Sequence, residues 1–251
     1  MTGEGRKPYM YIIWYNTGGM AYRLKISQLV IARSFASEET LEQLVERAQR
    51  TQKAGMLKVL DDFKVPLTDQ GMAQAIRTGK SMGHEGYTFD LGFYSPMIRS
   101  ADSLSLIDQG FDQQITAQMD QRLRPRDYGL MAQYSLAGLR QKFPEEVARR
   151  QSLGEFYYRP SGGESYADIV ERILGFFNEL NLSYQDKRIL VVTHGVIAKL
   201  MRYVIEGFGS TLDIDQQVLA DPRGELDPGG MIEYHFTERG IQLINLNRKF
   251  Y

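Results

Sequence analysis

From about residue 28 onward, short apolar runs alternate with segments whose apolar residues recur at helical spacing. The clearest apolar runs cover residues 28–32, 91–94 and 188–193, and an amphipathic segment follows each of them. Strands that alternate with helices are typical of a mostly parallel sheet covered by helices on both faces. The pattern therefore predicts an α/β fold, a three-layer α/β/α sandwich around a mostly parallel central sheet.

Composition places the chain among ordinary globular proteins and argues against several kinds of function. The 251 residues are 43% hydrophobic and 24% charged, which is enough for a full core. Cysteine is absent, which excludes disulfides, thiolate metal sites and cysteine nucleophiles. With only three histidines, we expect no histidine-rich metal centre, and nothing indicates a cofactor.

Charge and hydropathy argue against two kinds of partner. Thirty Lys and Arg residues face 31 Asp and Glu, so the net charge of −1 gives no general attraction to nucleic acid. The apolar run at residues 9–15 is too short to span a bilayer, and the polar start does not resemble a secretory signal. We therefore expect no nucleic-acid partner, no membrane span, and an intracellular location in the cytosol or an organelle matrix such as the mitochondrion.

Residues 1–28 precede the regular pattern and are expected to form an N-terminal extension. The aromatic run at residues 11–15 is strand-like, and turn residues follow it at 16–19. It could serve as a docking arm for protein partners in a larger complex, or it could pack on its own domain. Residues 29–251 then form the main domain.

Local signals indicate where individual helices begin. A helix is expected over residues 38–54, with capping-box spacing between Thr40 and Gln43. Thr68 is the expected N-cap of a second helix, and Ser95-Pro96 is expected to open a third with proline in its first turn. The side chains expected on the buried side of the second helix are those of Met72, Ala75 and Ile76.

The second half of the chain begins with a polar stretch. Residues 111–162 indicate loops with one or two short helices, and their clusters of arginine are interpreted as solvated loop charges. Ser165 is the expected cap of an apolar-striped helix. The chain is expected to finish with two strands over residues 231–236 and 241–246.

Three basic side chains lie at or just after predicted strand-to-helix junctions. They are Arg33, Arg99 and His194. In an open α/β sheet, ligands bind beyond the carboxyl ends of the strands. Two guanidinium groups and an imidazole beside helix N-termini are suited to binding phosphate. These three residues are therefore the predicted substrate-binding residues.

At these positions the sequence resembles the histidine phosphatase superfamily, whose fold is also called phosphoglycerate mutase-like. Six segments agree in order and spacing over roughly residues 28–250. They are Leu-Val-Ile-Ala-Arg at 29–33, Pro-Leu-Thr-Asp-Gln-Gly at 66–71 with Gln-Ala at 74–75, Tyr-Ser-Pro-Met-Ile-Arg-Ser-Ala at 94–101, Asp-Tyr-Gly at 127–129, Gly-Gly-Glu-Ser at 162–165 and Val-Val-Thr-His-Gly at 191–195.

The resemblance implies both matches and departures at the catalytic positions. The family's Arg-His-Gly-Glu run corresponds to residues 33–36, so Ser34 stands where the family has its phosphorylated histidine, and Phe35 adds bulk where a substrate would enter. The two usual positions of the family's proton-donating glutamate hold Pro125 and Ala132. Among the other histidines, His84 is the candidate to replace the missing nucleophile.

A second alignment of the first motif places it on residues 12–18, but that register supplies neither arginine nor histidine. With the first register, our main hypothesis is a catalytically degenerate, non-enzymatic relative that keeps a phosphate-binding pocket and acts as a binding or structural subunit of a larger assembly. The alternative is an active phosphomonoesterase or phosphoglycerate mutase-like enzyme with an unusual nucleophile, such as Ser34 or a water positioned by His194. A third possibility is a vestigial pocket.

Overall fold

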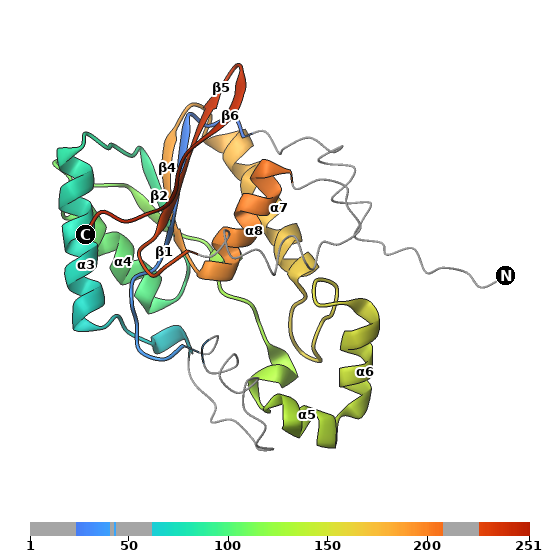
Figure 1. Ribbon diagram of the computed structural model, residues 1–251. Coiled ribbons are helices and arrows are strands. Elements are labelled where there is room, and N and C mark those ends of the chain that lie inside the picture. The colour runs from blue at the N-terminus through green and yellow to red at the C-terminus, as the bar shows by residue number, and fades with distance from the viewer. Residues whose placement is uncertain (1–23, 41–42, 44–61, 208–225) are drawn as a thin grey trace.

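The computed structural model describes residues 24–40, 43, 62–207 and 226–251. Within them a six-stranded sheet runs in the order β3-β2-β4-β1-β5-β6 (Figure 1). Its strands are β1 (Gln28–Arg33), β2 (Leu91–Tyr94), β3 (Ala117–Met119), β4 (Arg188–Thr193), β5 (Met231–Thr237) and β6 (Gly240–Arg248). The neighbours among β1 to β4 pair in parallel, whereas β5 and β6 are antiparallel.

Helices cover both faces of this sheet. Figure 1 shows α3 (Asp69–His84) and α4 (Ile98–Asp108) on one side, and α7 (Tyr166–Ser183) and α8 (Gly195–Glu206) on the other. Two shorter helices, α5 (Leu136–Lys142) and α6 (Pro144–Leu153), lie apart from these four, below the sheet in this view. The predicted three-layer α/β architecture is therefore confirmed.

Alternation along the central strands divides the core between the two faces. In β1, Leu29 and Ile31 belong to the cluster packed against α7 and α8, whereas Val30 and Ala32 belong to the cluster packed against α3 and α4. The residues of β4 alternate in the same way. Because successive side chains of a strand point to opposite faces, a strand covered on both faces must be apolar throughout.

Two predicted helix caps are present. The Oγ1 of Thr68 accepts a hydrogen bond from the backbone N–H of Gly71 at the start of α3. At the start of α7, the Ser165 hydroxyl oxygen accepts from the Asp168 N–H, and the Asp168 carboxylate accepts from the Ser165 N–H. These caps satisfy N–H groups that the first turn of a helix leaves unpaired.

Three local predictions are wrong. Met72 is 39% exposed, because the face of α3 that packs on α4 carries Ala75 and Gly79 instead. Pro96 lies outside α4, whose N-cap is Met97. The polar stretch at 111–162 contains an edge strand, β3, which its composition did not indicate because all three residues are exposed.

The predicted N-terminal arm lies almost wholly outside the described residues, and its docking role stays a prediction. The last part of that segment is described: Leu24 and Ile26 are buried in the core beside α7 and α8. Most of the helix expected over 38–54 also lies outside the described residues. None of the described helices is long and apolar enough to cross a bilayer.

Candidate functional site

The sheet brings Arg33, Arg99 and His194 to one cavity at the carboxyl ends of the parallel strands. Arg33 ends β1, and it is the register partner of Thr193, the residue before His194. Arg99 lies in the first turn of α4, shortly after β2. The cavity has a volume of about 90 Å³, and its lining residues are Arg33, Ser34, Phe35, Ala36, Ser37, Thr40, Gln43, Arg99, His194, Gly195 and Pro228.

Arg33 lies against the beginning of α8. One of its guanidinium nitrogens, Nη1, donates to the backbone carbonyl of Leu226. A Cβ added to Gly195 would be 3.4 Å from Arg33 Cζ, so a side chain here would crowd the guanidinium. Glycine at the first position of α8 therefore lets the helix N-terminus and the guanidinium act on the same anion.

Arg99 is almost fully buried and is held by Asp62. Its Nη1 donates to the Asp62 carbonyl at 2.7 Å, and its Nη2 donates to the Asp62 carboxylate at 2.9 Å. Among the described residues, its Nε has no hydrogen-bond partner. The arginine can therefore donate from its remaining N–H groups to a ligand in the cavity.

His194 is the N-cap residue of α8 and is 4% exposed. Its Nε2 lies 2.7 Å from the hydroxyl oxygen of Ser95, a buried residue directly after β2. Burial lowers the pKa of His194 well below its usual value, and the positive charges of Arg99, Arg33 and Arg172 lower it further. The imidazole is therefore neutral near pH 7.

Ser34 lines the cavity beside these three residues. It is 6% exposed, and its backbone N–H donates to the carbonyl of Thr193. The Phe35 ring packs into the α3/α4 core cluster, next to Gly229 and Tyr251. Although Phe35 also lines the cavity, it is only 2% exposed, so most of its bulk lies in the core instead of at the entrance.

The other predicted positions lie elsewhere. Pro125, Ala132 and His84 do not line the cavity. His84 is exposed at the last position of α3. The other end of this helix is the one near the cavity, because the backbone N–H of its N-cap, Thr68, donates to the carbonyl of Ala36, which lines the cavity. A 16-residue helix is about 24 Å long, which separates His84 from the cavity. His84 therefore cannot replace the missing nucleophile.

Sequence reasoning missed two members of the site, Asp62 and Ser95. Ser95 was considered as part of a helix start and of the segment at 94–101 that carries the family resemblance, with no role of its own, and Asp62 was not singled out. No local signal indicates either contact, because each joins residues far apart along the chain, 37 residues for Asp62–Arg99 and 99 for Ser95–His194. Thr40 and Gln43, expected only as a helix-capping pair, also line the cavity.

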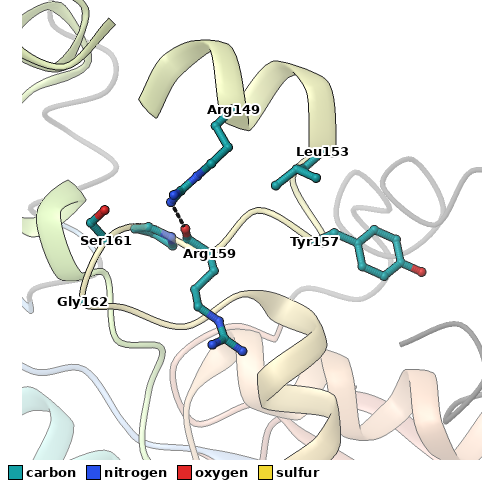
Figure 2. Close-up of a pocket in the computed structure, with 7 residues that line it drawn as sticks. Arg149, Leu153, Tyr157, Arg159, Ser161 and Gly162 are labelled. Carbon is teal, nitrogen blue, oxygen red and sulfur yellow. Dashed lines mark hydrogen bonds between the residues drawn. The ribbon is translucent and has the colours of Figure 1, made fainter. Parts of the chain in front are cut away.

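A larger hollow, of about 350 Å³, lies beside α6 (Figure 2). Two arginines line it, and guanidinium groups are suited to binding anions. Figure 2 shows Arg149 donating to the backbone carbonyl of Arg159, and Arg149 also pairs with Glu146 at 3.0 Å. The Arg159 guanidinium binds Asp168. Both arginines of this hollow are paired with carboxylates, whereas at the strand ends Arg99 is paired with Asp62 but Arg33 forms no ion pair with a described carboxylate. The smaller cavity also contains His194 and lies beside the N-terminus of α8, so it is the better phosphate site.

The family model of the histidine phosphatase superfamily (branch 1) matches residues 53–247 of the chain. The chain therefore belongs to this superfamily. The matched region contains Arg99 and His194 but begins after Arg33 and Ser34, so the correspondence of these two residues with the family's first motif stays a prediction.

Two bacterial relatives are each named a 2,3-bisphosphoglycerate-dependent phosphoglycerate mutase. The protein of Azorhizobium caulinodans is 34% identical over 147 residues, which cover 56% of this chain and 69% of the relative. The protein of Nitrobacter winogradskyi is 32% identical over 177 residues, covering 68% of this chain and 80% of the relative.

Solved structures share the fold at lower identity. The alpha-ribazole phosphatase from Shigella flexneri superimposes with a TM-score of 0.65 at 17% identity, covering 88% of this chain and 96% of that one. A mycobacterial glucosyl-3-phosphoglycerate phosphatase in complex with inorganic phosphate gives a TM-score of 0.60 at 18% identity, covering 89% of this chain and 98% of that one.

These findings correct our main functional hypothesis. The expectation of a non-enzymatic, catalytically degenerate binding subunit is wrong, because the relatives are named as mutases and phosphatases. The residues at Ser34, Pro125 and Ala132 had suggested lost catalysis, but missing residue types at these positions do not by themselves show that the reaction is lost. The alternative hypothesis, an active enzyme with an unusual nucleophile, fits the relatives better.

Proposed function

We propose that this protein is a phosphomonoesterase that binds the phosphoryl group of its substrate between Arg33, Arg99 and His194. The observation that carries the proposal is the convergence of these three side chains on one small cavity beside the N-terminus of α8. Fixed positive charge and N–H donors stabilise the negative charge that phosphoryl transfer spreads over the equatorial oxygens. The phosphate complex of one structural neighbour supports this choice of ligand.

The nucleophile in this proposal is an oxygen. Of the chain's three histidines, only His194 lines the cavity. The attacking oxygen is either the Ser34 hydroxyl or a water held beside His194. It forms a bond to phosphorus while the ester P–O bond breaks, and the proton that the attacking oxygen loses leaves with the alcohol. If Ser34 attacks, a water then hydrolyses the phosphoserine.

The first test measures turnover of p-nitrophenyl phosphate. An aryl phosphate suits this site because its leaving group needs little help from a proton donor. Arg33→Ala and Arg99→Ala are expected to lower kcat/KM by about 100-fold or more, since each removes a charged donor to the transition state. Arg239→Ala, an exposed arginine in the β5–β6 turn, is the matched control. Turnover that does not depend on Arg33 and Arg99 would contradict the proposal.

A second measurement identifies the nucleophile. If Ser34 attacks, Ser34→Ala abolishes turnover, and acid-quenched wild-type protein carries a phosphoserine at this position in its mass spectrum. If water attacks, Ser34→Ala retains most of the rate and no phosphoprotein accumulates. A phosphohistidine at His194, sought in a separate alkaline-quenched sample because acid hydrolyses its P–N bond, would contradict both routes.

Phosphoglycerate mutase activity is the second candidate, because the two relatives described above carry that name. It requires the phosphoryl group to be returned from the enzyme to a second hydroxyl of the substrate. It therefore needs the Ser34 route, and interconversion of 2- and 3-phosphoglycerate by the wild-type protein but not by Ser34→Ala would support it.

A further inference from the structure

The two ring nitrogens of His194 lie in different surroundings. Nε2 is 2.7 Å from Ser95 Oγ, and both residues are buried, at 4% and 0% exposure. His194 also lines the cavity, and among the described residues its Nδ1 has no hydrogen-bond partner. The hydrogen bond at Nε2 therefore decides what Nδ1 can offer to a ligand, because a neutral imidazole carries only one N–H.

The direction of the bond follows from the needs of the Ser95 hydroxyl. Its oxygen also accepts from the backbone N–H of Met97, at 3.4 Å. Its single hydrogen is expected to go to an acceptor where one is within reach, since a buried hydroxyl that donates to nothing is costly. Among the described residues, the only acceptor in hydrogen-bond reach of that hydrogen is His194 Nε2. The hydroxyl therefore donates to Nε2, and the ring proton lies on Nδ1.

The charges around the ring agree with this arrangement. Three cations, Arg33, Arg99 and Arg172, disfavour a doubly protonated imidazole, and burial disfavours it as well. A neutral ring that accepts at Nε2 has one remaining hydrogen, and that hydrogen is a donor at the other nitrogen. Such a ring can bind an anion but has no lone pair on Nδ1 with which to attack phosphorus or to remove a proton.

The sheet builds this contact into the fold. β2 and β4 are parallel neighbours, and Tyr94 is the register partner of Val192. Ser95 follows Tyr94, and its N–H donates to the Val192 carbonyl at 3.1 Å. His194 follows Val192 two residues later. Both side chains therefore leave adjacent strands at the same level.

We propose that Ser95 is a positioning residue that fixes His194 in the Nδ1–H tautomer, which makes His194 a hydrogen-bond donor to a phosphate oxygen and excludes it as base or nucleophile. The part that concerns phosphate rests on the proposed function. The part that concerns the tautomer rests on the contacts of Ser95 alone.

The tautomer is measured by nitrogen-15 NMR of histidine-labelled protein without substrate. Protonated and unprotonated ring nitrogens have widely separated shifts, and His194→Gln assigns the signals. In the wild type we expect a protonated Nδ1 and an unprotonated Nε2, and in Ser95→Ala a loss of this preference. Ser95→Thr, which keeps the hydroxyl, is expected to restore it.

The matched control is Ser100→Ala. Ser100 lies in the first turn of α4 and is fully buried, as Ser95 is. Its hydroxyl has no hydrogen-bond partner among the described residues. Removing this hydroxyl is therefore expected to leave the His194 signals unchanged. A wild-type ring protonated at Nε2 would overturn the proposal. The same conclusion would follow if Ser95→Ala kept the Nδ1–H preference, or if Ser100→Ala lost it.

Phosphate binding is measured separately, by phosphorus-31 NMR titration with inorganic phosphate. Ser95→Ala is expected to weaken binding about 3- to 10-fold, as for one impaired hydrogen bond to a charged ligand, while Ser100→Ala is not. If neither the wild type nor the variants bind phosphate although the wild-type ring is protonated at Nδ1, the proposed function fails and the tautomer assignment stands. If phosphate binds but the ring is protonated at Nε2, the tautomer assignment fails alone.

Discussion

At the scale of single residues, the Arg99–Asp62 pair shows how a buried cation is kept beside a cavity. Two of the five guanidinium N–H groups bind Asp62, and the pair is nearly closed to solvent, with side chains 3% and 10% exposed. An arginine without this partner would be a buried, uncompensated charge. Asp62 therefore stabilises the cavity before any ligand arrives.

Replacing Asp62 with alanine is expected to lower the free energy of unfolding by about 3 kcal/mol, because it leaves Arg99 unpaired. Asp62→Asn keeps an acceptor oxygen and should cost less. Urea denaturation measures both variants. The matched control is Glu85→Ala, which removes a surface carboxylate from an exposed pair with Arg248 and should cost about 1 kcal/mol at most. Equal losses for Asp62→Ala and Glu85→Ala would contradict the argument.

His194 also predicts how stability depends on pH. Its pKa in the folded protein lies well below the ordinary value of 6.5. Below pH 6.5, the unfolded chain takes up a proton at this residue while the folded protein does not. The free energy of unfolding therefore falls as the pH decreases from 6.5 toward the folded pKa, by up to about 1.4 kcal/mol per pH unit from this group.

Urea denaturation between pH 7 and pH 5 measures this effect. The wild type is expected to lose stability more steeply than His194→Gln, which lacks the titrating group. His84→Gln, which changes an exposed histidine outside the cavity, should follow the wild type. Parallel curves for the wild type and His194→Gln would show that His194 is not held neutral.

At the scale of helices and strands, local pattern and tertiary contact contributed differently. Strands β1 and β4 were predictable, because covering both faces of a strand requires an unbroken apolar run. Which face of α3 is exposed was not predictable, because the hydropathy of Met72 is compatible with either the buried or the exposed face of the helix. What decides is the close approach of α3 to α4, which needs small residues such as Gly79 at the contact.

Two glycines in helices should therefore respond in opposite ways to alanine. A Cβ at Gly79 in α3 would lie 2.0 Å from the Ile107 carbonyl oxygen, so Gly79→Ala should lower the free energy of unfolding by at least about 2 kcal/mol. A Cβ added at Gly175 in α7 would meet no atom of the described residues within 4 Å, so Gly175→Ala should raise it by about 0.5–1 kcal/mol. Denaturant unfolding compares them, and a loss in both would refute the packing argument.

At the scale of the whole molecule, the distribution of charge limits where an anion can bind. The arginines of the polar middle stretch are paired with carboxylates: Arg122 with Asp120, Arg124 with Glu164, and Arg126 with Glu155. The interpretation of this stretch as solvated loop charge was therefore incomplete, because these charges form ion pairs across loops and helices. The net charge of −1 gives the rest of the surface no long-range attraction for anions that would compete with the cavity.

A ligand that binds only the folded protein should stabilise the whole molecule. Inorganic phosphate at 100 times its dissociation constant is expected to add about 2.7 kcal/mol to the free energy of unfolding. Thermal unfolding should therefore shift upward with phosphate in the wild type and in Arg239→Ala, but not in Arg33→Ala. Sodium chloride at matched ionic strength controls for screening. An equal shift with chloride would show that the effect is not site binding.

The sequence by itself determined the α/β class, the positions of the central strands and the superfamily. These depend on periodicity and on motif order, which are properties of neighbouring residues. It also indicated Arg33, Arg99 and His194, because the end of a strand can be recognised locally and the carboxyl ends of parallel strands meet at one edge of a sheet.

Only the tertiary structure decided which groups act on those three residues. Asp62 binds Arg99 and Ser95 binds His194 across 37 and 99 residues of chain, and no local pattern connects such pairs. The neutral state of His194 likewise follows from burial and from three arginines gathered by the fold. Side-chain chemistry is set by what lies within a few ångströms, and that neighbourhood exists only once the sheet has formed.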